Sequence, residues 1–120
     1  VRSLFDKGNV SGSITAIESD NGLIVAIDIT SVPQVSIVMD FDKSISFEGI
    51  SSPDNDGLEF DISGTRAKII HKGHSHYKMT FRRSDGHDAP VDIRIFDGDT
   101  LIAERLIGKN QLSGPYDVSR

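Results

Sequence analysis

Four histidines, the side chains that combine metal binding with proton transfer near neutral pH, lie within seventeen residues of one another. They are His71, His74, His76 and His87. In an extended chain, residues two apart point to one side, so His74 and His76 could chelate an ion together while His71 points away. Zinc requires three or four ligands, and the lysines and arginines around these imidazoles oppose a cation. We therefore expect the solvated tip of a hairpin here rather than a metal site.

The segment from residue 64 to residue 84 contains no Asp or Glu, although the chain has 18 acidic residues. It carries six permanent cations: Arg66, Lys68, Lys72, Lys78, Arg82 and Arg83. Residues 1–61 hold eleven acids against three basic residues, and the net charge of the chain is −5. That balance argues against general nucleic-acid binding, and the basic segment is a local feature of an acidic protein.

Alternating apolar residues predict that this basic segment is a β-hairpin with a three-residue loop at residues 72–74, in which Gly73 or a neighbour has a positive φ. The register places three pairs on the buried side: Ile69–Tyr77, Ala67–Met79 and Thr65–Phe81. On the outer side it opposes Lys68 to Lys78, which is normally destabilising. Either an acid on the next strand, Glu59 or Asp61, compensates, or the surface serves an anionic ligand.

The outer face of the predicted hairpin supplies the candidate ligand-binding residues. Guanidinium and ammonium groups recognise carboxylates and sulfates through charge-assisted hydrogen bonds. The candidate residues are Arg66, Lys68, His76, Lys78 and Arg82. A solvated charged face is the alternative interpretation of the same cluster, because exposed charges are common on protein surfaces.

Carboxylates also gather in two runs that could bind calcium, which prefers oxygen ligands. The candidate metal ligands are Asp40, Asp42, Asp54 and Asp56. The second run begins like an EF-hand loop, but Thr65 stands where that loop needs a bidentate Glu. Asp and Asn beside Gly are also typical of tight turns, so we favour turns and keep structural calcium as the alternative.

Catalytic chemistry has little support in this chain. It has no cysteine, which excludes disulfides, thiolate metal sites and cysteine nucleophiles. No nucleophile elbow, phosphate loop or dinucleotide fingerprint is present, so we expect neither an enzyme nor a cofactor. No apolar run approaches the ~20 residues that span a bilayer, so membrane insertion is not expected. The start at Val1 suggests a processed protein or an excised domain.

Turn signals separate short stretches of period-two alternation along the whole chain. The turns are DNG at 20–22, DNDG at 54–57, SDG at 84–86 and FDGD at 96–99. Alternation of this kind buries one face of each strand, as in packed antiparallel sheets. We predict an all-β antiparallel sandwich, jelly-roll or immunoglobulin-like, with about nine short strands and no substantial helix. One domain should cover residues 1–110, followed by an irregular tail at 111–120.

Residues 57–86, GLEFDISGTRAKIIHKGHSHYKMTFRRSDG, resemble the middle of jelly-roll carbohydrate-binding modules of polysaccharide-degrading enzymes. The opening SLFDKGNVSGSITA resembles the start of such modules. The resemblance implies a sandwich fold and a polysaccharide ligand. These modules generally stack sugars on aromatic rings, but this chain has no Trp, and we expect only Tyr116, Phe5 and Phe96 to be exposed. An anionic glycan therefore suits the sequence better than a neutral one.

A second stretch is similar to cell-envelope AMIN domains. It is residues 35–62, VSIVMDFDKSISFEGISSPDNDGLEFDI. This resemblance implies a structural or protein-interaction domain without a small-molecule ligand. From the two resemblances we expect a non-catalytic module, extracellular or periplasmic, whose partner is a polysaccharide or a protein neighbour in a larger chain.

Overall fold

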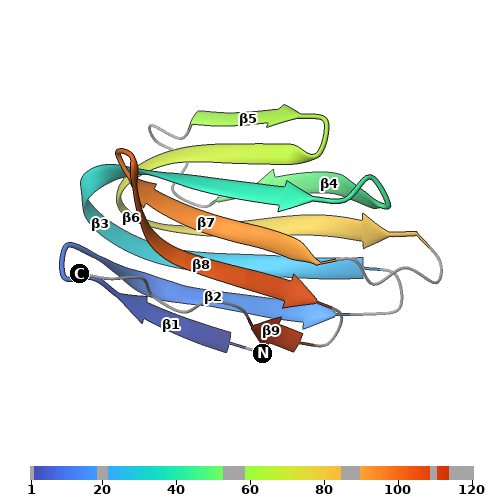
Figure 1. The fold of residues 1–120 in the computed structure, drawn as a ribbon, viewed down its shortest axis with the longest axis horizontal. Coiled ribbons are helices and arrows are strands. Elements are labelled where there is room, and N and C mark those ends of the chain that lie inside the picture. The colour runs from blue at the N-terminus through green and yellow to red at the C-terminus, as the bar shows by residue number, and fades with distance from the viewer. Residues whose placement is uncertain (1, 19–21, 53–58, 85–89, 109–110, 114–120) are drawn as a thin grey trace.

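The computed structural model describes residues 2–18, 22–52, 59–84, 90–108 and 111–113, which form nine antiparallel strands (Figure 1). The strands are β1 (Arg2–Asp6), β2 (Val10–Glu18), β3 (Gly22–Phe41), β4 (Ile45–Ser51), β5 (Glu59–Ser63), β6 (Arg66–Arg83), β7 (Val91–Asp97), β8 (Thr100–Gly108) and β9 (Gln111–Ser113). No helix, and hence none able to cross a membrane, occurs in these ranges. The predicted all-β sandwich is confirmed. Strand β9 occupies the start of the segment predicted to be an irregular tail.

Two long strands organise the sandwich. Strands β3 and β6 pair with each other over most of their length, from Gly22 opposite Arg82 to Asp40 opposite Arg66. Figure 1 shows both curving round together at the left of the view, so that each passes from one layer to the other. Because the two strands are antiparallel, the first half of β3 and the second half of β6 lie in one layer and the remaining halves lie in the other, so that a single folded ribbon creates a sandwich.

Each layer is completed by strands that pair with only one half of this ribbon. Sheet I has the order β1-β2-β3-β6-β4 and uses β3 up to Ser31 and β6 from Gly73 onward. Sheet II has the order β5-β6-β3-β7-β8-β9 and uses β3 from Val35 and β6 up to His71. We use these two names below.

The bend coincides with an irregularity in the ribbon. The register shifts between Ser31 and Val35 of β3, and the facing residue of β6 is Gly73, whose φ is 88°. A residue with a side chain is strained at such a φ, so glycine permits the bend without that cost. The extra residues of β3 lengthen the outer path around the corner, as a bulge does.

The predicted hairpin at residues 72–74 is therefore wrong. Gly73 has the expected positive φ, but it bends one continuous strand and does not reverse the chain. The reversal lies instead at Gly64 and Thr65, between β5 and β6, and Thr65 is exposed there, not buried. A three-residue loop and an unbroken strand place the same odd-numbered side chains inward, so alternation could not distinguish them.

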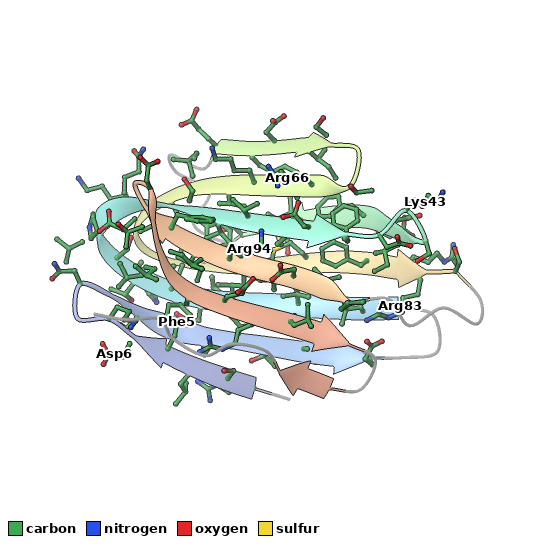
Figure 2. All side chains as sticks on the ribbon, in the orientation of Figure 1. Phe5, Asp6, Lys43, Arg66, Arg83 and Arg94 are labelled. Carbon is green, nitrogen blue, oxygen red and sulfur yellow. The ribbon has the colours of Figure 1, made fainter. Side chains whose placement is uncertain are left out.

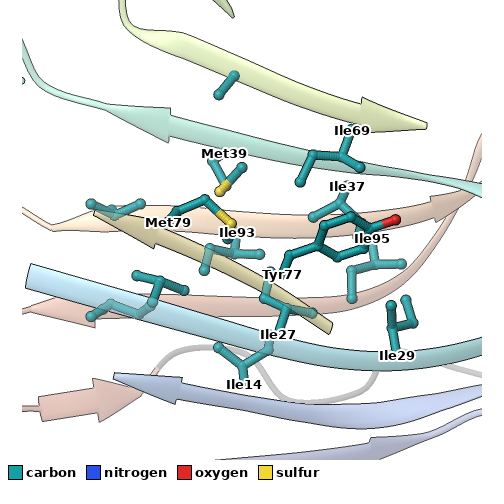
Figure 3. Packing of buried hydrophobic residues seen from close by; sticks show 14 of the residues in the cluster. Ile14, Ile27, Ile29, Ile37, Met39, Ile69, Tyr77, Met79, Ile93 and Ile95 are labelled. Carbon is teal, nitrogen blue, oxygen red and sulfur yellow. The ribbon is translucent and has the colours of Figure 1, made fainter. Parts of the chain in front are cut away.

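The core lies between the two sheets and follows the predicted alternation. Tyr77, Met79 and Phe81 of β6 are buried as predicted, and Ala67 and Ile69 are buried at the other end of the same strand. Figure 3 shows residues from both layers meeting in this core. Phe5 departs from the expectation of an exposed aromatic, because it is 3% exposed and belongs to the core. The alternation was thus a reliable guide to the buried face of β6.

Buried arginines close two margins of the core. Arg83, at the end of β6, forms an ion pair of 2.8 Å with Glu18 of β2, and both side chains are buried (Figure 2). Arg105 of β8 donates to Ser3 Oγ at 2.7 Å and to the Leu4 carbonyl at 2.9 Å, both on β1. The contacts of Arg105 connect β1, the edge strand of sheet I, to sheet II. Buried charges need such partners, because desolvation without them is costly.

His71 and Tyr77 form a polar contact on the inner side of the bend. The His71 Nδ1 lies 2.6 Å from the Tyr77 hydroxyl, and its Nε2 lies 2.8 Å from the Gly73 carbonyl. Since a carbonyl only accepts, Nε2 carries the proton and Nδ1 accepts from Tyr77. Burial lowers the pKa of His71 below its ordinary 6.5, although the contact with Gly73 opposes that shift. The neutral imidazole is the form that fits the corner.

We expect Gly73→Ala to destabilise the protein by about 1–2 kcal/mol, because alanine resists the left-handed φ at the bend. Gly49→Ala is the matched control, since Gly49 has an ordinary φ and open space where its Cβ would lie. Urea denaturation measures both. Equal free energies of unfolding for the two variants would mean that the bend does not depend on glycine.

We expect the free energy of unfolding to decrease as the pH is lowered, because His71 becomes protonated more readily in the unfolded chain. Because the folded-state pKa lies below the unfolded value, the unfolded chain binds the proton more readily, and stability drops as pH falls through about 6.5. The slope contributed by one such group is at most about 1.4 kcal/mol per pH unit.

Two variants test this role. His71→Gln keeps a side chain that can accept a hydrogen bond from Tyr77 and donate one to Gly73. His76→Gln is the control, because it replaces an exposed histidine. Urea denaturation at about pH 7.5 and about pH 5.5 should show a smaller pH effect in His71→Gln than in His76→Gln. The same pH effect in the parent and in His71→Gln would contradict this role.

Candidate functional site

The bend of β6 divides the predicted ligand-binding residues between two surfaces. Arg66 and Lys68 project from the outer face of sheet II, whereas His76, Lys78 and Arg82 project from the outer face of sheet I. All five are exposed, as predicted. The predicted opposition of Lys68 and Lys78 does not occur, because the two residues are separated by the bend along one strand.

On sheet II the basic residues meet acids from neighbouring strands. Arg66 Nε lies 2.8 Å from Asp40 Oδ1 across the β6–β3 pair, and this contact raises the pKa of Arg66. Arg94 of β7 contacts Asp92 at 2.6 Å and Glu104 at 2.7 Å, and lies 3.7 Å from Asp40 (Figure 2). A ladder of alternating charge thus runs across four strands.

Lys68 lies directly opposite Asp61 of β5, one of the two acids expected to compensate it. Glu59, the other candidate, lies opposite Ile70. Opposite charges on facing positions of an antiparallel pair attract each other. Arg66 is therefore ion-paired with Asp40, and Lys68 faces an acidic residue on the neighbouring strand.

On sheet I, the outward side chains of β6 form a row that we call the basic stripe. Its members are His74, His76, Lys78, Thr80 and Arg82, and all are exposed. No acidic group of the described residues lies within 4.0 Å of the charged nitrogens of Lys78 or Arg82. Two permanent cations are therefore presented to solvent without an ion pair in the described part of the chain.

Asp28 of β3 accompanies the two histidines of the basic stripe. Its carboxylate lies 3.1 Å from His74 Nε2 through one oxygen and 4.0 Å from His76 Nδ1 through the other. The prediction that His74 and His76 share a side, with His71 on the other, is confirmed. The three groups are exposed, and in the described residues no three histidine or acidic side chains are placed to hold a metal ion.

An open groove of about 340 Å³ borders the middle of the basic stripe. It is lined by Gly49, Ile50, Ser51, Lys78 and Thr80, which come from the neighbouring strands β4 and β6. The pairing of these strands shifts register between Phe47 and Gly49, so Glu48 is the extra residue of a bulge. Two hydroxyls and an ammonium group therefore border one depression, while Ile50, which lies opposite Met79, packs against the core.

Of the four predicted calcium ligands, the structure describes Asp40 and Asp42. Asp40 is engaged by Arg66 and Arg94, as described above. Asp42 lies in the exposed turn before β4, where its carboxylate accepts from the Ser44 amide at 3.0 Å. Hydrogen bonds from Ser44 lower the pKa of Asp42, because they stabilise the ionised carboxylate. Asp54 and Asp56 lie outside the described residues.

Several residues of this surface have no counterpart in the sequence-based prediction: Asp28, Gly49, Ser51 and Thr80. Thr80 follows from the alternation, because it shares the parity of Lys78 and Arg82. The other three come from β3 and β4, and only the strand pairing brings them to β6. Phe, Tyr and Trp are absent from the described outward positions of sheet I. Phe96 is half-buried on sheet II, and Tyr116 lies outside the described residues.

No protein-family model matches this chain, and no curated protein matches it in sequence. Among solved structures, it is similar to the chitin-binding domain of a chitinase from Pyrococcus furiosus, with a TM-score of 0.60 and 10% identity. That match covers 78% of this chain and 99% of the domain. The N-terminal domain of a Streptococcus gordonii adhesin has a TM-score of 0.49 and 7% identity, over 80% of this chain and 27% of that one. The first of these matches shows that the chain has a fold like that of the chitin-binding domain.

Proposed function

We propose that this protein is a non-catalytic carbohydrate-binding module that binds an anionic glycan on the outer face of sheet I. The observation that carries the proposal is the basic stripe beside an open groove, with Lys78 and Arg82 free of ion pairs to the described residues. The likeness of the fold to a chitin-binding domain supports a carbohydrate ligand. The proposed binding residues are His76, Lys78 and Arg82.

The chemistry of the groove suits a sugar that carries a carboxylate or sulfate. Lys78 can form a charge-assisted hydrogen bond with the anionic group, while Ser51 and Thr80 can exchange hydrogen bonds with sugar hydroxyls. A neutral polymer such as chitin is disfavoured at this surface, because its rings would need an aromatic platform that the described outward residues of sheet I lack.

Arg66 and Lys68 do not belong to this proposed surface. They lie on the other layer, and acids of β3 and β5 face them. Of the five candidate residues, only the three on sheet I are proposed to bind the glycan. Arg66 and Lys68 serve as control positions in the experiment below.

A polysaccharide ligand implies an extracellular or periplasmic place of action, which is part of this proposal. Catalysis is not part of it.

The second candidate function is a structural or protein-interaction domain within a larger chain. The charge ladder of sheet II, in which Arg94 meets acids from three strands, favours that alternative for the opposite face, because such a ladder stiffens a surface without leaving charge for a small anion.

A glycan array at low and high salt tests the proposed site. The parent protein should bind uronate or sulfated glycans, and binding should weaken with salt because the charges are exposed. The double variant Lys78→Ala/Arg82→Ala should lose at least about tenfold in affinity. The matched control Arg66→Ala/Lys68→Ala removes the same number of charges from sheet II and should bind like the parent.

Equal losses in the two double variants would show that net charge, not the basic stripe, governs binding. Absence of binding to every anionic glycan would refute the proposed function and favour the protein-interaction alternative. Circular dichroism of both variants establishes that each remains folded, which is expected because all four side chains are exposed.

A further inference from the structure

Resting on the proposed function, we infer that the ligand is a linear polyanionic glycan that lies along β6, and not a single anionic sugar or a chain end. The argument begins with the alignment of the stripe. His74, His76, Lys78 and Arg82 project from one strand on one side, and Thr80 occupies the intervening position. A ligand that met only one of these groups would leave the others without a role.

The length of the stripe exceeds what one sugar ring can contact. Alternate residues of a strand are about 6.6–6.8 Å apart, so the stripe from His74 to Arg82 extends roughly 27 Å. The longest dimension of the described domain is 40 Å, so the stripe follows much of it. The groove at Lys78 and Thr80 lies within this line and can hold one sugar, while neighbouring sugars reach Arg82 in one direction and the histidines in the other.

Small side chains flank the central part of the stripe on both sides. On β4, Ser46, Gly49 and Ser51 lie opposite Arg82, Thr80 and Lys78 respectively. On β3, Gly22 and Ala26 lie opposite Arg82 and Lys78, and the half-buried Ile24 lies opposite Thr80 between them. Because the residues that face Lys78 and Arg82 are small, these two long side chains stand clear of their neighbours and can contact an extended chain. Asp28, beside His74 and His76, adds a hydrogen-bond acceptor at one end of the line.

A single-stranded nucleic acid is the other linear polyanion that such a row of cations could attract. Proteins that bind it without sequence preference stack the bases on aromatic side chains. The outward positions of sheet I that the structure describes hold no Phe, Tyr or Trp, and the protein carries a net charge of −5. Hydroxyls beside the cations match a sugar better than a base, so the glycan is the favoured class.

The test is a length series of β-1,4-linked oligomannuronates, which carry one carboxylate per sugar, from disaccharide to octasaccharide. Affinities are measured by calorimetry at low salt with the whole 120-residue chain. The octasaccharide should bind at least about tenfold more tightly than the disaccharide, because each additional exposed contact is worth a few-fold. Arg82→Gln should weaken the octasaccharide more than the disaccharide, whereas the control Lys68→Gln should leave the length dependence as in the parent.

The outcomes separate this inference from the proposed function. If disaccharide and octasaccharide bind the parent equally, the extended site is refuted while anionic-glycan binding stands. If neither they nor a sulfated series (heparin oligosaccharides of the same lengths) binds, the proposed function fails and the inference falls with it. If an oligothymidylate of matched charge binds as tightly as the octasaccharide, the assignment to a glycan is overturned.

Discussion

The continuous pairing of β3 with β6 is the constraint on which the rest of the structure depends. Because these strands are hydrogen-bonded to each other on both sides of the bend, neither can turn the corner without the other. The shifted register of β3 and the positive φ of Gly73 meet at that corner, and the buried contact between His71 and Tyr77 lies on its inner side. Each of the remaining strands belongs to only one of the two layers that the β3–β6 pair connects.

The sequence was sufficient to predict the layers but not the path of the chain through them. Alternation assigns Tyr77, Met79 and Phe81 to the core because a strand has a period of two, whatever it pairs with. The hairpin was wrong because an odd-length loop and an uninterrupted strand preserve the same parity across Gly73. The length of the partner strand decides between a hairpin and a continuous β6. Strand β3 continues through Pro33, so it is long enough to pair with β6 on both sides of Gly73.

The candidate site was predictable to the same extent and for the same reason. The exposure of Lys78 and Arg82 followed from parity, and Asp61, which faces Lys68, was one of the two acids expected on the adjoining strand. That Arg66 and Lys68 face away from the other candidates could not be predicted, because it results from the bend. The groove was also beyond prediction, since it borders a bulge in β4 that has no signature in the residues around Glu48.

The place of the basic stripe on an interior strand has a mechanical consequence. In sheet I, β6 is hydrogen-bonded to β3 on one side and to β4 on the other, and beyond the bend it continues into sheet II between β3 and β5. A force applied along a polymer held by Lys78 and Arg82 would load these ladders in shear, many hydrogen bonds at once, and would be shared by both layers. An anchor on an edge strand such as β1 would instead load only the ladder to its single neighbour, β2.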